Sequence, residues 1–297
     1  MPATVKGKLT IDGCELDITN PDKLLWPEDG ITKLVYLQRL GELAPYLIKH
    51  CRGRYLTTIR YPNGIDGKSF YQKNCPQPQP PFVQLAEQSG IHYVHLDSLP
   101  TLLWLGNLAA LEFHASFDRI NEPLVPTEWV LDLDPSQDEE PRIMEAAMRV
   151  GDVLHSLGIR SIPKTSGATG VQITVPLQRD LSFDELRHIG LFIGEYLTST
   201  YPDLFTIERL KKNRGKLIYV DYLQHYQGKT LSAPYTPRAR PGAPVSTPLT
   251  WDEVRRSPHP TEFNLLTIGK RLSQMGDLME QTEPQQLRPI LEFISKR

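Results

Sequence analysis

The second half of this 297-residue chain predicts an α/β (α+β) fold, in which strands and helices follow one another in the order β-α-β-β-α-β. Three observations support the prediction: apolar runs of strand length, longer segments with helical periodicity, and turns rich in Gly between them. That order is typical of a split β-α-β, or RRM-like, unit. In such a unit the first and last strands lie side by side.

Each element of this unit has its own sequence signal. The second helix opens with Ser182 and Glu185, which form a capping-box pair, and the first helix ends at Gly158. The predicted elements are a strand at 129–134, a helix at 140–158, strands at 160–166 and 171–177, a helix at 182–201 and a strand at 216–223.

The first 125 residues predict a mixed α/β lobe, with a helix at 32–48, a strand at 55–62 and a helix at 99–114. No linker or low-complexity segment marks a clean boundary. We therefore predict a single domain over 1–297, with an N-terminal α/β lobe at about 1–125 and an RRM-like lobe with a C-terminal extension at about 126–297.

The composition is that of an ordinary globular protein, with 39% hydrophobic and 23% charged residues. No apolar run approaches the roughly 20 residues needed to span a bilayer, and the N-terminus has no apolar signal core, so we expect a cytoplasmic protein without a membrane partner. Cys14, Cys51 and Cys75 are too scattered for a C-x-x-C zinc pair, so we interpret them as reduced and structural. The net charge of −2 neither requires nor forbids nucleic acid.

Two aspartates lie one residue apart in the apolar run "WVLDLDPS". Alternation places Asp132 and Asp134 on one face of the strand, with Cα atoms about 6.5 to 7 Å apart. If the strand at 216–223 is the neighbour, Asp221 joins them. Three carboxylates on one face repel each other unless a cation lies between them, and all-oxygen ligands favour Mg²⁺ or Mn²⁺. A two-metal site of this kind suits phosphoryl or nucleotidyl transfer. Alternatively, D-x-D forms a turn with Pro135.

Other segments offer phosphate and nucleic-acid contacts, each with a structural alternative. The "KTSGATG" connection at 164–170 can direct backbone N–H groups at a phosphate, or it is an ordinary hairpin. Basic runs at 209–216 and 228–242 flank Asp221, although such runs are usually solvated. Aromatic residues alternate with cations at 60–74, as in base-stacking surfaces or in a half-buried edge strand. His114 alone is more typical of a structural histidine.

Seven segments in order resemble the polymerase domain of bacterial DNA ligase D, a branch of the archaeo-eukaryotic primase superfamily that acts in non-homologous end joining. The segments are "ITNPDKLLWPEDGITK", "RYPNGIDGKSFYQKN", "LEFHASF", "LDLDP", "KTSGATG", "VDYLQHYQGKT" and "APYTPRARPGAPVSTPLTWDEV". The resemblance runs from about residue 15 to 290. It implies a primase-like fold, with the RRM-like catalytic unit packed on the N-terminal α/β unit.

The resemblance also implies roles for individual residues. Asp132, Asp134 and Asp221 look like the family's metal-binding and catalytic triad. The residues that match ligands of the incoming nucleotide are His114, Ser166, Gly167, Gln224, Arg238 and Arg240. The residues that match DNA contacts are Asn20, Lys23 and Lys33 for a 5′-phosphate, and Phe70, Tyr71, Lys73 and Arg214 around the template.

The chain departs from the family pattern at two positions of one segment. Family members often carry "SGxKGLH", where this chain has "SGATGVQ", so Thr169 replaces a lysine and Gln172 a histidine. Loss of a cation could lower nucleotide affinity by about 1 to 3 kcal/mol, whereas Gln can still donate a hydrogen bond. No ligase or nuclease module accompanies the domain, so we expect a stand-alone enzyme or an excised domain, and the starting methionine slightly favours the first.

The resemblance implies a template-dependent nucleotidyltransferase that fills gaps and extends 3′ ends at DNA double-strand breaks. Its expected partners are DNA ends and gaps with a 5′-phosphate, nucleoside triphosphates with a preference for ribonucleotides, Ku and a DNA ligase, and its expected cofactor is Mn²⁺ or Mg²⁺. Two alternatives stay open. One is a non-catalytic DNA-end binding module that uses Lys23 and Lys33, and the other is a metal-dependent phosphohydrolase that uses the same carboxylates.

Overall fold

The computed structural model describes residues 5–296, which form two compact units. Unit 1 contains the chain up to Ser116 together with Thr230–Ser246 and Phe263–Gly276. Unit 2 contains Phe117–Lys229, Thr247–Glu262 and the chain from Asp277 onward. The C-terminal extension therefore contributes segments to both units, whereas the sequence predicted it wholly within the RRM-like lobe. That both units form one domain stays a prediction.

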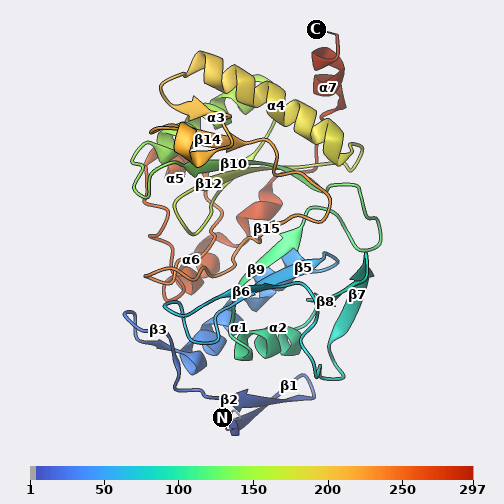
Figure 1. The fold of residues 1–297 in the computed structure, drawn as a ribbon, viewed down its shortest axis with the longest axis vertical. Helices are drawn as coiled ribbons and strands as arrows, with labels where there is room; N and C mark the ends of the chain where they lie inside the picture. Colours follow the sequence, from blue (N-terminus) through green and yellow to red (C-terminus); the bar gives the residue numbers. More distant parts are fainter. Residues whose placement is uncertain (1–4, 297) are drawn as a thin grey trace. The chain divides into compact units, whose positions relative to one another are not determined.

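Unit 1 is built on a four-stranded antiparallel sheet with the order β15-β9-β5-β6. Its strands are β5 (Leu56–Arg60), β6 (Phe70–Gln72), β9 (Ala110–Ser116) and β15 (Thr230–Ser232). The helices α1 and α2 lie together on one face of this sheet (Figure 1). Three short antiparallel pairs complete the β structure of the unit: β1 (Val5–Ile11) with β2 (Cys14–Thr19), β3 (Leu24–Trp26) with β4 (Ile31–Thr32), and β7 (Gln84–Gln88) with β8 (Ile91–His95).

The helices of unit 1 are α1 (Lys33–Cys51), α2 (Leu99–Asn107) and α6 (Ile268–Met275). Helix α1 confirms the predicted helix at 32–48 and extends it to Cys51. Its N-cap is Thr32, whose side chain accepts a hydrogen bond from the Val35 N–H.

The predicted helix at 99–114 is wrong beyond Asn107. The chain turns through Ala109, which has a φ of +58°, and continues as the strand β9. Strand β9 pairs with β5 on one side and β15 on the other. These backbone hydrogen bonds on both edges override the helical pattern of the local sequence. As a result, His114 lies on a strand and shares a face with Glu112 two residues earlier.

Unit 2 contains the predicted β-α-β-β-α-β order and one further short strand. Its five-stranded sheet has the order β11-β12-β10-β14-β13, so the first and last predicted strands are indeed neighbours. The strands are β10 (Glu128–Pro135), β11 (Ile162–Thr165), β12 (Val171–Pro176), β13 (Phe205–Thr206) and β14 (Ile218–Asp221). Only β13, which was not predicted, runs parallel to its neighbour.

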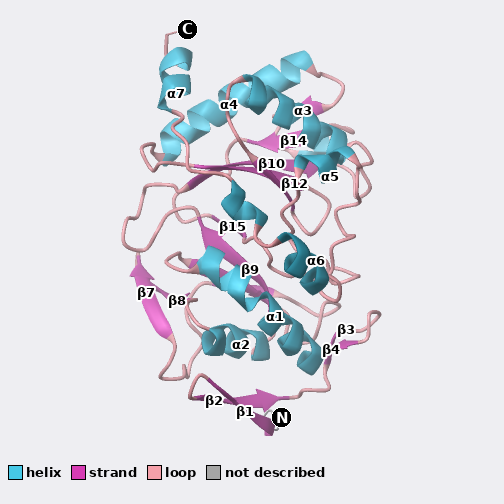
Figure 2. Ribbon diagram, turned by 180° about the vertical axis from the view of Figure 1, so that it is seen from behind, coloured by secondary structure: helices cyan, strands magenta, loops and turns pink. Residues whose placement is uncertain are grey.

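The helices α3 (Ile143–Ser156) and α4 (Phe183–Thr200) cover one face of this sheet (Figures 1 and 2). Helix α4 begins with the predicted capping box, and its Gly190 lies against Trp129 of β10. Because side chains alternate along a strand, the even-numbered aspartates of β10 point to the opposite face. The remaining helical segments of the unit are the 3₁₀ turns η1 (Lys211–Asn213) and η2 (Leu278–Gln281) and the short helices α5 (Trp251–Arg255) and α7 (Arg288–Ile294).

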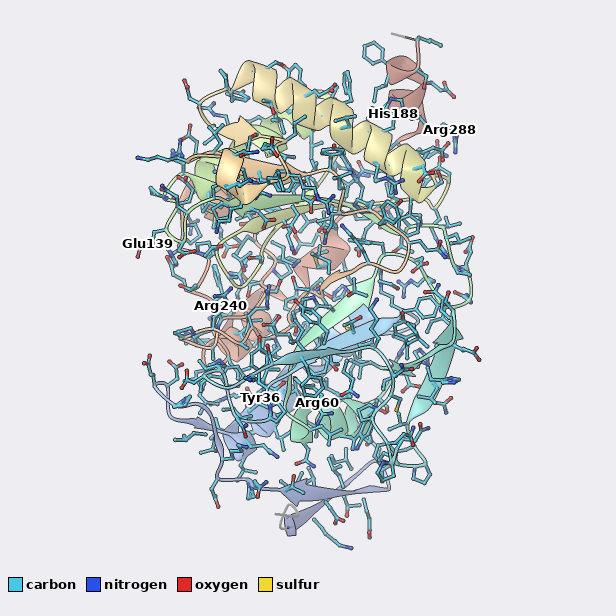
Figure 3. All side chains as sticks on the ribbon, viewed as in Figure 1. Tyr36, Arg60, Glu139, His188, Arg240 and Arg288 are labelled. Carbon is cyan, nitrogen blue, oxygen red and sulfur yellow. The ribbon has the colours of Figure 1, made fainter. Side chains whose placement is uncertain are left out.

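Helix α7 is held near the start of α4. Arg288 bonds the backbone oxygen of Asp180 and approaches the Glu185 carboxylate at 3.4 Å; Figure 3 marks Arg288 together with His188 of α4. Between residues 5 and 296, no helix has the length and apolar character required to cross a membrane.

Candidate active site

A row of four side chains crosses the helix-free face of the unit 2 sheet. Strand register places Lys164 of β11 opposite Gln172 of β12, Gln172 opposite Asp132 of β10, and Asp132 opposite Asp221 of β14. Directly paired residues of adjacent strands point to the same side, so the row is continuous. The structure therefore brings Asp132 and Asp221 together as predicted, with Asp134 two residues along β10.

The surroundings of Asp132 disfavour its charged form. Its side chain is 7% exposed, and its Oδ1 atom has no hydrogen-bond partner. Burial raises the pKa of Asp132 well above its usual range, and the negative charges of Asp134 and Asp221 raise it further. A hydrogen bond from Gln172 and the charge of Lys164 only partly offset this. Lys164 in turn donates to the Gln172 Oε1 atom, which fixes the amide with its N–H groups toward Asp132.

The other two aspartates differ in their surroundings. Asp221 Oδ1 accepts hydrogen bonds from the Leu223 N–H at 3.0 Å and from the Tyr219 hydroxyl at 3.2 Å. Burial and the Asp221 charge raise the pKa of Tyr219, which keeps its hydroxyl a donor. Asp134 is exposed to solvent. Across residues 5–296, no group of three or more His, Cys, Asp or Glu side chains could hold a metal ion as they stand.

The residues nevertheless fit a hard divalent cation. An uncompensated carboxylate oxygen is buried at Asp132, and two further carboxylates lie beside it on the same face. Oxygen donors of this kind suit Mg²⁺ or Mn²⁺. Asp134 is exposed on the same face of the strand as Asp132. The turn alternative explains neither the orphaned oxygen of Asp132 nor its pairing with Asp221.

A pocket of about 540 Å³ opens beside these carboxylates within unit 2. Its wall combines Asp134 and Asp221 with cationic and aromatic side chains, which are Arg209, Arg214, Lys229, Tyr219 and Tyr226. Arg214, predicted as a DNA contact, lies 3.9 Å above the Tyr219 ring and donates to the Glu208 and Arg209 backbone oxygens. Carboxylates for a cation and positive charges for phosphates thus line one cavity.

The "TSG" turn at 165–167 is stabilised from within. Ser166 Oγ accepts hydrogen bonds from the Ala168 and Gly170 N–H groups, each at 3.1 Å, and Gly167 has a φ of +70°. Gly170 approaches β10 so closely that an added Cβ would lie 2.5 Å from the Leu133 oxygen. The turn is therefore fixed against the aspartate strand, and its contact with phosphate stays a prediction. Gln224, another nucleotide candidate of unit 2, follows β14 and is half-buried.

The remaining nucleotide candidates belong to unit 1, where sequence reasoning missed their common partner. Glu112 Oε2 accepts from His114 Nε2 at 2.9 Å and from Arg238 Nε at 3.0 Å, and Oε1 accepts from the Ala239 N–H at 3.1 Å. The available signal was the acid in "LEFH", because Glu112 lies two residues before His114 and therefore on the same face of the strand. Arg240, labelled in Figure 3, is exposed, and its backbone oxygen accepts a hydrogen bond from the Trp26 indole N–H.

Burial raises the pKa of the Glu112 carboxyl, but this effect is outweighed. The hydrogen bond and charge of His114, the charge of Arg238 and the Ala239 amide lower the pKa to about 2. Glu112 is therefore a carboxylate at neutral pH, buried between two cationic or potentially cationic groups.

A cationic cluster of unit 1, formed by Lys23, Lys33 and Arg60, contains two of the residues predicted to bind a 5′-phosphate. The backbone N–H of Lys33 donates to the backbone oxygen of Lys23, and the backbone N–H of Lys23 donates to the backbone oxygen of Asn20. Asn20 adopts a positive φ of +46°. Lys33 is 4% exposed, and its Nζ donates to the Asn107 oxygen at 2.8 Å. Burial, followed by the charges of Lys23 and Arg60, lowers the pKa of Lys33 to about 8. Sequence reasoning did not assign Arg60, which Figure 3 marks, to this cluster.

The predicted stacking residues lie on an edge strand of unit 1. Phe70 and Tyr71 of β6 are 43% and 72% exposed, which departs from the half-buried edge-strand alternative. The Arg60 guanidinium lies 5.2 Å from the Phe70 ring centroid, and Lys73 is also exposed. Phe70, Tyr71 and Lys73 belong to unit 1 and Arg214 belongs to unit 2, although the resemblance grouped all four around the template.

Comparison with known proteins identifies the family. The family model of the LigD primase-polymerase domain matches residues 32–279. The polymerase domain from Mycobacterium tuberculosis Ligase D, solved in complex with DNA, has a TM-score of 0.82 and 30% identity, and the match covers 90% of this chain and 97% of that chain. The fold is thus that of a primase-type polymerase domain. This chain belongs to the LigD primase-polymerase domain family.

Curated relatives are longer than this chain. The bifunctional non-homologous end joining protein LigD of Bacillus subtilis (strain 168) is 38% identical over 289 residues, which cover 95% of this chain and 47% of that protein. The multifunctional LigD of Mycobacterium tuberculosis (strain H37Rv) is 32% identical over 279 residues, which cover 90% and 37%. The chain therefore spans less than half the length of these relatives.

Proposed function

We propose that this protein is a template-dependent nucleotidyltransferase that extends a primer 3′-OH at DNA breaks and short gaps. The observation that carries the proposal is the aspartate cluster, formed by Asp132, Asp134 and Asp221, on the open face of the unit 2 sheet. The membership of the chain in the LigD primase-polymerase domain family supports the same proposal. Like charges at this density are stable only with a cation, and cations beside a positively lined pocket suit phosphoryl chemistry.

In this mechanism the aspartate cluster would hold Mn²⁺ or Mg²⁺. When bound, the cation would lower the pKa of the attacking 3′-OH and neutralise charge on the triphosphate. The chain's own residues hold the ligands in place. Gln172 orients Asp132, and the Tyr219 hydroxyl orients Asp221. The positive side chains of the neighbouring pocket bind phosphate oxygens, which aligns the reacting groups for displacement.

The residues proposed to contact the incoming nucleotide are those that match the family's nucleotide ligands. Ser166, Gly167 and Gln224 of unit 2 and His114, Arg238 and Arg240 of unit 1 match family ligands, and a preference for ribonucleotides is proposed on the same resemblance. The departure at Gln172 is compatible with activity, because the amide supplies a hydrogen bond to Asp132.

DNA is proposed to bind through unit 1 as well. The solved relative is a complex with DNA, and this supports the same class of partner here. Asn20, Lys23 and Lys33 would hold a 5′-phosphate through the positive potential of their cluster. Phe70 and Tyr71 offer exposed ring faces for template bases, with Lys73 beside them. Because the relatives are named for non-homologous end joining, Ku and a DNA ligase are the proposed protein partners.

Primer extension on a short-gapped duplex with Mn²⁺ tests the proposal. The duplex is prepared with a 5′-phosphorylated or an unphosphorylated downstream strand and is supplied with ribonucleotides or deoxynucleotides. We expect extension that is favoured by ribonucleotides and by the phosphate. Binding without extension would instead indicate a DNA-end binding module, and release of nucleoside phosphates without primer growth would indicate a phosphohydrolase.

A further inference from the structure

A buried acid in unit 1 links two residues that are proposed to contact the nucleotide. Glu112 accepts three hydrogen bonds, and two of them come from His114 Nε2 and Arg238 Nε. The side chain of Glu112 is only 5% exposed, against 13% for His114 and 16% for Arg238. The carboxylate thus lies beneath the other two groups, further from solvent than either.

The geometry of these bonds fixes both partners. The Glu112 carboxylate can only accept, so the neutral His114 ring must carry its proton on Nε2. The bond to Arg238 uses Nε, which sets the plane of the guanidinium. A third bond, from the Ala239 N–H, holds the backbone next to Arg238 at the same carboxylate.

The segment that carries Arg238 is tied to strand β9 by a further contact. The Phe113 N–H donates to the Thr236 hydroxyl at 2.8 Å, and both residues are buried. Two further ionisable groups feel the charge of the acid. They are Tyr36 and Tyr61, whose pKa values are raised by burial first and then by the Glu112 charge. Both stay neutral hydroxyls, so Glu112 supplies the negative charge in its contacts with His114 and Arg238.

We propose that Glu112 is a positioning residue that prepares His114 and Arg238, as one preformed pair, for the phosphates of the incoming nucleotide. This inference rests on the proposed function. Glu112 itself does not touch the nucleotide in this proposal. A preformed pair lowers the cost of ordering two long side chains on binding, so its loss weakens nucleotide binding more than it slows chemistry.

The test compares Glu112→Gln with the wild type in primer extension. An amide has one oxygen and two N–H groups, so in either orientation an N–H faces one of the three donors. We expect the KM for the nucleotide to rise at least tenfold, while kcat changes less than threefold and binding to a 5′-phosphorylated gap is unchanged. Glu112→Asp keeps both acceptor oxygens and should recover part of the KM. Glu42→Gln is the matched control, because it removes an exposed carboxylate of unit 1 that pairs with Arg39.

A ¹⁵N NMR measurement on histidine-labelled protein provides a second readout that does not need activity. The His114 Nε2 proton should exchange slowly with solvent in the wild type and rapidly in Glu112→Gln. An unchanged KM, or rapid exchange already in the wild type, would overturn the inference. An inactive wild type with a protected Nε2 proton would count against the proposed polymerase function and leave the bond between Glu112 and His114 standing. A parallel fall of kcat and folded fraction, without recovery in Glu112→Asp, would reduce Glu112 to a structural role.

Discussion

The two units each contain a buried charged cluster, and the clusters are balanced in opposite ways. In unit 1, Glu112 lies between His114 and Arg238, and both of its oxygens accept hydrogen bonds. In unit 2, Asp132 lies beside two further carboxylates, and one of its oxygens has no partner. The charges of the first cluster are balanced within the protein, whereas in the second the charge of Lys164 only partly offsets the three carboxylates.

This difference indicates different roles. A satisfied cluster stabilises the fold and fixes the orientation of its members. A cluster of like charges costs stability and is retained where a ligand supplies the missing charge. The cluster of Lys23, Lys33 and Arg60 is the positively charged counterpart, because burial first and then the charges of Lys23 and Arg60 lower the pKa of Lys33. Cations are therefore expected at the aspartates and an anion at the lysines.

The largest expected effect follows from Asp132→Asn, which keeps the shape of the side chain and removes its charge. We expect primer extension with Mn²⁺ to fall by about 10³-fold or more, because the cation loses its buried ligand. Asp138→Asn is the control, since Asp138 is exposed in the same unit. Extension within a few fold of the wild type would remove the functional distinction between the two clusters.

The Glu112 cluster should make the stability of the protein depend on pH in the acid range. The pKa of Glu112 is lowered from 4.5 to about 2, so its stabilising contribution is present above pH 4.5 and is lost as the pH falls toward 2. We expect urea unfolding at pH 7 to show Glu112→Gln less stable than the wild type by about 2 to 3 kcal/mol. This difference in unfolding free energy should shrink progressively between pH 4.5 and 2. A difference in unfolding free energy that is independent of pH would show that the charge of Glu112 does not balance its partners.

The lysine cluster extends the comparison to anions. Lys33→Met should weaken binding to 5′-phosphorylated gaps by about tenfold, with no change for unphosphorylated gaps, as measured by fluorescence anisotropy. The pKa of Lys33 is about 8, so its cation is present at pH 7 and lost as the pH rises through 8. The preference of the wild type for phosphate should therefore decline between pH 7 and 9. Equal weakening for both duplexes would point to a structural role.

The smallest effect is expected at the compensating amide. Gln172→Leu removes the hydrogen bond to Asp132 and one acceptor for Lys164. We expect extension to fall by about tenfold, equivalent to roughly 1.4 kcal/mol, through misplacement of the Asp132 carboxylate. Titration of extension against Mn²⁺ should show a higher half-saturating concentration. An unchanged Mn²⁺ requirement would show that Asp132 is positioned by its strand alone.

Strand periodicity and the β-α-β-β-α-β order were enough to predict the aspartate cluster. The alternation of β10 and the pairing of β10 with β14 both follow from local sequence and a general rule of topology. The Glu112 cluster was missed because Arg238 lies 126 positions along the chain from Glu112, and no local pattern encodes that contact. The same limit hid the end of α2, where pairing with β5 and β15 decides between helix and strand. The roles of individual residues toward nucleotide and DNA stay predictions.

Thermal unfolding with and without MnCl₂, for the wild type and Asp132→Asn, tests most directly whether the aspartate cluster is completed by a cation. Without metal, we expect Asp132→Asn to melt higher than the wild type, by about 2 to 4 °C for each kcal/mol of relieved repulsion. With Mn²⁺, the wild type should gain stability in proportion to its occupancy, and Asp132→Asn should gain little. A lower melting temperature of Asp132→Asn without metal, together with an equal response of both proteins to Mn²⁺, would contradict this role.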